Sequence, residues 1–75
     1  MVKIQNNLRA LRLAVGLTQL EVAQLLGFKT SERISLWEMG LAYPSIQNLG
    51  ELTKCFNVMS HEIYPDLFKA PNALK

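Results

Sequence analysis

Thr18, Gln19 and Glu21 have the types and the spacing to bind backbone groups and an anion. The Thr18 side chain can accept from the backbone N–H of Glu21, while the Glu21 carboxylate accepts from the N–H of Thr18. This reciprocal pair, a capping box, predicts the start of a helix. The N–H groups and the positive dipole end there attract a phosphate, and the Gln19 amide can add a donor. The alternative for Gln19 is an ordinary solvated side chain.

A second group of polar side chains belongs to a helix that starts near Thr30 or Ser31. Ile34 and Trp37 are three positions apart and predict its buried face. The residues that this spacing leaves on the other face are Ser31, Glu32, Ser35 and Leu36.

These outward side chains could read the edges of base pairs in a DNA major groove. Glu32 can accept a hydrogen bond from a cytosine amino group, and Leu36 can contact a thymine methyl. Ser31 and Ser35 can donate or accept without discriminating between bases. Arg33 can meet guanine or a phosphate, depending on the rotation of the helix. The alternative is that all of them are simply exposed to solvent.

Two short helices joined by a tight turn, at about residues 18–39, must position these side chains. In the first helix, apolar residues recur at a helical spacing, and Gly27 suits the left-handed conformation after its end. These apolar residues are Val22, Ala23, Leu25 and Leu26. Two such helices crossing steeply form a helix-turn-helix, which places its second helix in the major groove.

A series of different short motifs follows a fixed order along most of the chain. They are Leu8-Arg9 and Leu11-Arg12 before Gly16, Leu17-Thr18-Gln19, the run from Ala23 to Gly27, Ile34-Ser35, Trp37-Glu38, Gly40 and Pro44-Ser45. Together they resemble the Xre/Cro-repressor type of helix-turn-helix domain from about Leu8 to Phe68. The resemblance implies a lambda-repressor-like fold and a phosphate contact for Gln19. It also implies a structural ion pair between Arg12 and Glu38 that ties the first helix to the third.

Two loops depart from the family pattern. The turn Gly27-Phe28-Lys29-Thr30 is one residue longer than its commonest form. The loop after Gly40 often carries basic or amide residues, but here it reads Leu41-Ala42-Tyr43. We expect Lys29, Thr30 and Tyr43, together with Thr18, to complete the DNA-binding set, with the Tyr43 hydroxyl able to donate to a phosphate.

The fold class predicted for residues 1–69 is all-α, a compact bundle of about five helices, followed by a short tail at 70–75. The first helix is expected from Gln5 to Val15, the fourth from Pro44-Ser45 to Asn57, and the last from Ser60 to Tyr64. The expected inward residues are Leu8, Leu11 and Val15 in the first helix, Ile46, Leu49, Leu52, Thr53 and Phe56 in the fourth, and Val58, Ile63, Leu67 and Phe68 near the end.

Gly50 inside the fourth helix costs about 1 kcal/mol relative to alanine. This cost predicts a close backbone approach at Gly50, either within the fold or between subunits.

Composition limits the classes of function. The chain has 75 residues, 49% of them hydrophobic, which fits one small globular domain. No apolar run is long enough to span a membrane, and no secretory signal is visible. A lone cysteine, Cys55, fits the cytoplasm. Cys55 and the single histidine His61 form no catalytic set, so we expect no enzyme, metal or cofactor. The net charge of +2 predicts few phosphate ion pairs.

The sequence favours a sequence-specific DNA-binding transcriptional regulator. We expect a repressor that binds double-stranded DNA as a homodimer on an inverted-repeat operator, similar in kind to phage repressors, restriction-modification controllers or antitoxins. A cognate protein such as a toxin would fit the last kind. The dimer is expected to form through Met59, Tyr64, Leu67 and Phe68. The alternative is a protein-interaction module with the same fold that has lost specific DNA binding.

Overall fold

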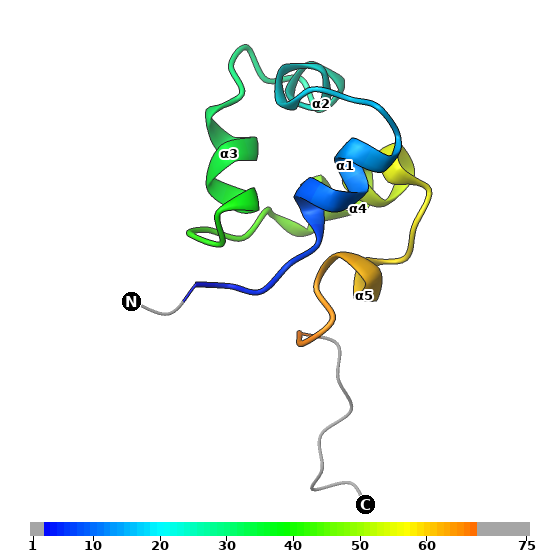
Figure 1. Ribbon diagram of the computed structural model, residues 1–75. Coiled ribbons are helices and arrows are strands. Elements are labelled where there is room, and N and C mark those ends of the chain that lie inside the picture. The colour runs from blue at the N-terminus through cyan, green and yellow to red at the C-terminus, as the bar shows by residue number, and fades with distance from the viewer. Residues whose placement is uncertain (1–2, 68–75) are drawn as a thin grey trace, which may run out of the picture.

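The computed structural model describes residues 3–67, which form five helices and no strand. The helices are α1 (Leu8–Ala14), α2 (Gln19–Leu25), α3 (Glu32–Glu38), α4 (Ile46–Phe56) and α5 (Ser60–Ile63). Helix α3 contacts both α2 and α1, while α5 lies against α4 (Figure 1). The predicted all-α fold is confirmed, whereas residues 68–75, with Phe68 and the expected tail, lie outside the described residues.

One apolar core holds the helices together, and every helix contributes to it. Its buried side chains are Leu8, Val22, Ala23, Ile34, Trp37, Leu52, Phe56, Ile63 and Tyr64. Because burial of large apolar side chains is the main favourable contribution to folding, helices as short as the four residues of α5 are stable here only through these contacts.

The ends of α4 match the expectation from sequence. Ser45 precedes the helix, and its hydroxyl accepts from the N–H of Asn48 at 3.1 Å. At the other end, Asn57 adopts a left-handed conformation with φ of 55°. A serine cap and an asparagine stop therefore fix the length of the longest helix.

The first helix is shorter than predicted, because residues 3–7 run across the bundle as a non-helical strap. The Asn6 carboxamide accepts from the N–H of Leu8 at 3.0 Å and donates to the carbonyl of Trp37 at 3.1 Å. The N–H of Asn7 donates to the carbonyl of Ile63 at 2.9 Å. These tertiary hydrogen bonds compete with a further helical turn, so the prediction of a helix from Gln5 is wrong.

Gly40 lets this strap approach the end of α3. The N–H of Ile4 donates to the carbonyl of Gly40 at 2.9 Å. A Cβ on Gly40 would lie 2.5 Å from the carbonyl oxygen of Ile4 and 2.8 Å from its nitrogen. Gly40 also has a φ of +75°, so both its conformation and its surroundings require glycine.

Four residues expected to face the core are exposed instead: Val15, Leu25, Ile46 and Leu67. Val15 follows the last residue of α1, so the helical spacing no longer applies to it. Leu25 closes α2, whose buried face is set by Val22 and Ala23. Ile46 is 89% exposed. Among residues 3–67, no atom lies within 4 Å of the place where a Cβ on Gly50 would be, so no close approach within this part of the chain explains the glycine.

Tyr64 was expected at a dimer surface, but it is a core residue that is 1% exposed. It follows the single turn of α5, where its N–H donates to the carbonyl of Ser60, and its ring lies 5.4 Å from that of Tyr43. Burial of the ring in the core of its own chain stabilises the fold. Tyr64 is therefore not available to contact a partner. Met59 and Leu67, from the same expected surface, are exposed.

Among residues 3–67, no helix combines the length and the apolar character that crossing a membrane requires.

The Gly40 contact yields a stability prediction. Gly40→Ala should lower the free energy of unfolding by several kcal/mol more than Gly16→Ala, as measured by urea denaturation. Gly16 is the matched control because its φ is +77° while nothing lies within 4 Å of its missing Cβ. Its alanine variant carries only the conformational cost of about 1–2 kcal/mol. Equal losses in the two variants would show that the strap does not press on Gly40.

Tyr64 yields a prediction at alkaline pH. Burial, with a smaller contribution from Tyr43, raises the pKa of Tyr64 from 10.0 to about 12. The unfolded chain therefore loses this proton first, and stability falls as the pH rises between those two values. Tyr64→Phe should remove that part of the loss in urea denaturation, whereas Tyr43→Phe at an exposed ring should not.

At neutral pH, Tyr64→Phe should keep or raise stability, because the buried hydroxyl has no hydrogen-bond partner among the described residues. An unchanged alkaline slope in this variant would contradict the account.

Candidate nucleic-acid interface

The start of α2 is fixed by a capping box. The Thr18 hydroxyl accepts from the N–H of Glu21 at 3.0 Å, and the Thr18 N–H donates to the Glu21 carboxylate at 2.8 Å. Thr18 has extended backbone angles, and the helix begins at the next residue, Gln19. The reciprocal contact expected from the spacing is present.

Arg12 and Glu38 form a nearly buried ion pair between α1 and α3. Their side chains are 9% and 5% exposed. Arg12 donates through Nε and Nη2 to the two oxygens of Glu38, and its Nη1 donates to the carbonyl of Leu17 at 2.9 Å. The hydrogen bonds that Arg12 donates to Glu38, helped by the charge of the carboxylate, raise the pKa of Arg12 despite the opposing effect of burial. This pair therefore fixes the first helix against the third, as the resemblance implied.

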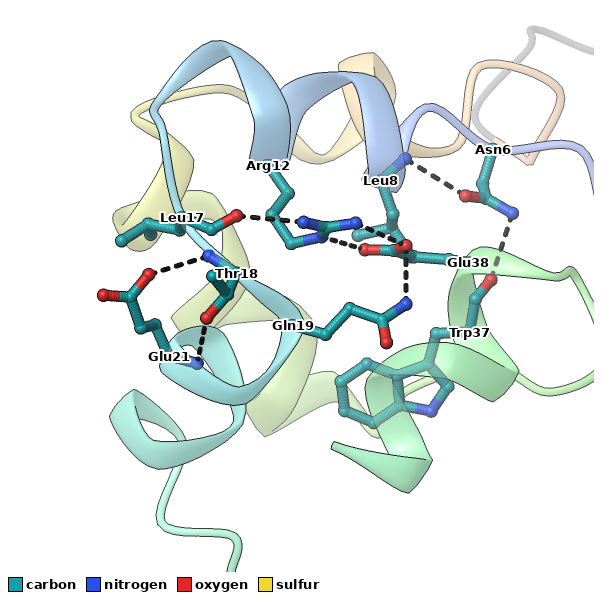
Figure 2. A network of polar contacts seen from close by, with 9 residues as sticks. All are labelled: Asn6, Leu8, Arg12, Leu17, Thr18, Gln19, Glu21, Trp37 and Glu38. Carbon is teal, nitrogen blue, oxygen red and sulfur yellow. Dashed lines mark hydrogen bonds and ion pairs between the residues drawn. The ribbon is translucent and has the colours of Figure 1, made fainter. Parts of the chain in front are cut away.

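Gln19 joins the same network, which the sequence did not predict. Its Nε2 donates to Oε1 of Glu38 at 3.0 Å, so the side chain reaches across from α2 to the end of α3 (Figure 2). Neither alternative from the sequence, a phosphate donor or a solvated side chain, includes this contact. An amide nitrogen carries two N–H groups, so one remains for a further acceptor. No local motif links Gln19 to Glu38, because they are 19 positions apart.

The two faces of α3 divide as expected. Ile34 and Trp37 are buried, while Glu32, Arg33 and Leu36 are exposed. The helix begins after Ser31, which makes no capping hydrogen bond through its side chain. The rest of the expected DNA-binding set divides by exposure as follows: Thr18, Lys29, Thr30 and Tyr43 are exposed, while Gln19, Ser31 and Ser35 are half-buried.

Phe28 was not predicted as a site residue, yet its ring contacts two residues of α3, Arg33 and Trp37. The guanidinium carbon of Arg33 lies 4.8 Å from the centre of the Phe28 ring, a cation–π contact. Phe28 in turn meets the Trp37 ring edge-on, with centroids 6.0 Å apart. Its position in the lengthened turn is the only sequence signal for it. The contact restrains Arg33 on the outer face of α3.

The loop from α3 to α4 presents apolar and aromatic groups. Leu41 and Tyr43 are exposed, and the loop contains no lysine or arginine. Tyr43 packs against Tyr64, so its ring is supported while about half of its surface stays open. Any phosphate contact here would depend on a hydroxyl or on backbone N–H groups.

The described residues contain no group of three or more histidine, cysteine, aspartate or glutamate side chains that could hold a metal ion. The arrangement offers hydrogen-bond donors and acceptors on an exposed helix, supported by a second helix and a buried ion pair. This chemistry suits recognition by shape and hydrogen bonding.

Comparison with known proteins agrees with this geometry. A protein-family model described as Helix-turn-helix matches residues 8–62. No match was found among curated proteins. The matched range begins at the first residue of α1 and ends within α5.

The buried network yields a further stability prediction. Glu38→Ala should lower the free energy of unfolding by about 3–5 kcal/mol, because it leaves Arg12 buried without its partner. The double variant Arg12→Met with Glu38→Leu should recover much of that loss, since it removes both charges. Chemical denaturation measures both variants, with Glu51→Ala as a control at an exposed ion pair. A small loss in Glu38→Ala would contradict the structural role of the pair.

Proposed function

The chain belongs to the Xre/lambda-repressor type of helix-turn-helix family and is a DNA-binding transcription regulator, and from this premise we propose that it is a sequence-specific repressor. It acts as a homodimer on an inverted-repeat operator, with one α3 helix reading each half-site. Such half-sites lie about 34 Å apart, one turn of the duplex. Its place of action is the cytoplasm.

The outer face of α3 is the observation that carries this proposal. Glu32, Arg33 and Leu36 are exposed, while Ile34 and Trp37 hold the opposite face in the core. The exposed residues combine an acceptor, a cation and an apolar group, which is what discrimination between base-pair edges requires. Arg33 is also restrained by Phe28 before any DNA arrives, which lowers the entropy cost of a base contact.

Gln19 and its neighbours orient the protein on the duplex without reading sequence. Glu38 holds one N–H of the Gln19 amide, so the side chain has a defined direction at the start of α2. The second N–H donates to a phosphate, and Thr18, Lys29, Thr30 and Tyr43 add contacts to the backbone. Contacts of this kind set register and affinity, whereas base contacts set specificity.

A second candidate function rests on the loop between α3 and α4. Leu41 is exposed where a phosphate-binding loop would carry a polar or basic residue. This apolar loop favours a protein-interaction module that keeps the fold without selecting DNA. A toxin that pairs with an antitoxin would be one such partner. The polar outer face of α3 favours the repressor instead.

Selection of bound sequences from a pool of random duplexes tests the proposal. The wild-type protein should select an inverted repeat. Glu32→Ala and Arg33→Ala should each change the preferred sequence, with a loss of about 1–3 kcal/mol at the position that is read. Gln19→Ala should weaken binding to all sequences alike.

Lys54→Ala serves as the control, because it removes an exposed charge on α4 and should leave the preference unchanged. Melting temperatures should accompany each variant, since Gln19 also contributes to the buried network. A protein with equal affinity for every duplex at moderate salt would contradict the specific-reader proposal and favour the interaction module.

A further inference from the structure

The line of residues along α3 that lies farthest from the core consists of Glu32, Leu36 and Met39. At 100° per residue, Leu36 and Met39 lie within roughly 40° of Glu32 around the helix axis. The buried Ile34 and Trp37 lie roughly 140–160° from Glu32, on the core side. Met39 caps the helix and still has right-handed helical backbone angles, so the same spacing applies to it.

Two of these three side chains are apolar and open: Leu36 is 37% exposed and Met39 is 45% exposed. The chain then turns back beside them. The N–H of Gly40 donates to the carbonyl of Trp37 at 3.1 Å, and the N–H of Leu41 donates to the carbonyl of Leu36 at 3.0 Å. This pair of hydrogen bonds is a Schellman motif, which returns Leu41, itself 45% exposed, to the level of Leu36. Three open apolar side chains therefore lie at the end of α3.

The whole of α3 is short enough to lie inside a major groove. Its seven residues span about 10 Å, and the major groove of B-form DNA is about 12 Å wide. A helix that enters the groove by its outer face therefore brings Leu36, one turn after Glu32, to base edges. The apolar side chains continue the proposed reading face that Glu32 begins, and this continuity favours DNA over an unrelated protein as their partner.

An apolar side chain matches one group on the base-pair edges. Among the four bases, only thymine presents an apolar group in the major groove, its C5 methyl. Guanine, adenine and cytosine present acceptors and amino donors there. A leucine packed on those polar groups would remove their water without replacing its hydrogen bonds, which is unfavourable. Leu36 therefore favours thymine and selects against the edge of guanine.

We propose that Leu36 and Met39 bind the C5 methyl groups of thymines in each half-site, so that the chain recognises its operator partly by methyl groups. This inference rests on the proposed function, because it names the base that the end of α3 selects. Glu32, one turn earlier on the same line, accepts from the amino group of a neighbouring cytosine or adenine. Leu41, at the level of Leu36, excludes water from the methyl contact.

Removal of the methyl group from the DNA tests the contact without altering the protein. The duplex that the full wild-type chain selects from a random pool is remade with deoxyuridine in place of thymine, one position at a time. Deoxyuridine lacks only the C5 methyl and pairs with adenine as thymine does. At the position that Leu36 contacts, loss of one buried methyl should weaken binding about fourfold, as measured by fluorescence anisotropy of a labelled duplex.

Leu36→Ala should remove this dependence, so that the thymine and deoxyuridine duplexes bind the variant with equal affinity. Met39→Ala should remove the dependence at a second thymine. Leu13→Ala is the matched control, because it shortens a 55% exposed leucine on α1 and should leave the methyl dependence intact. Alanine has the highest helix propensity, so all three variants should stay folded, and melting temperatures check this.

Two results would overturn the inference and leave the proposed function standing. One is a selected duplex whose affinity stays the same when each thymine in turn is replaced by deoxyuridine. The other is a Leu36→Ala variant that selects the same duplex and keeps the full dependence on its methyl groups. A wild-type chain that selects no duplex at all would overturn the proposed function as well, and would favour a protein partner for the apolar end of α3.

Discussion

The carboxylate of Glu38 is the group on which the arrangement of the first three helices depends. It ends α3, accepts two hydrogen bonds from Arg12 on α1, and accepts a third from Gln19 on α2. A charge that is 95% buried is tolerated only where such donors replace the lost water. Because the three contacts must be made together, they fix α1, α2 and α3 in one geometry. These three hydrogen bonds therefore also set the orientation of the outer face of α3.

The C-terminal end of α3 is fixed a second time by the strap at residues 3–7. Asn6 binds the carbonyl of Trp37, and Ile4 lies against Gly40 at a distance that only glycine allows. The N-terminal end is held differently, since Ser31 makes no side-chain cap and Arg33 lies over Phe28. The helix is therefore rigid where it joins the core, and it carries its exposed polar groups at the end that a groove would meet.

The features predicted correctly are those that neighbouring residues determine. The capping box at Thr18, the stop at Asn57 and the buried pair Ile34 and Trp37 follow from spacing within one or two turns. Contacts between distant positions could not be predicted in this way, as Gln19 with Glu38 and Phe28 beneath Arg33 show. Helical periodicity also failed at element ends, where Ile46 has no core left to face. The Arg12–Glu38 pair was expected only because the motifs resemble a family.

The modest net charge of the chain limits how strongly it can attract DNA. A net charge of +2 supplies little of the phosphate attraction that gives many DNA-binding proteins their affinity. The loop after Gly40 adds no cation either. The proposed joining of two copies would compensate, because the second half-site is then bound at a high effective concentration. Affinity in the proposed repressor would thus come from paired reading helices more than from phosphate contacts.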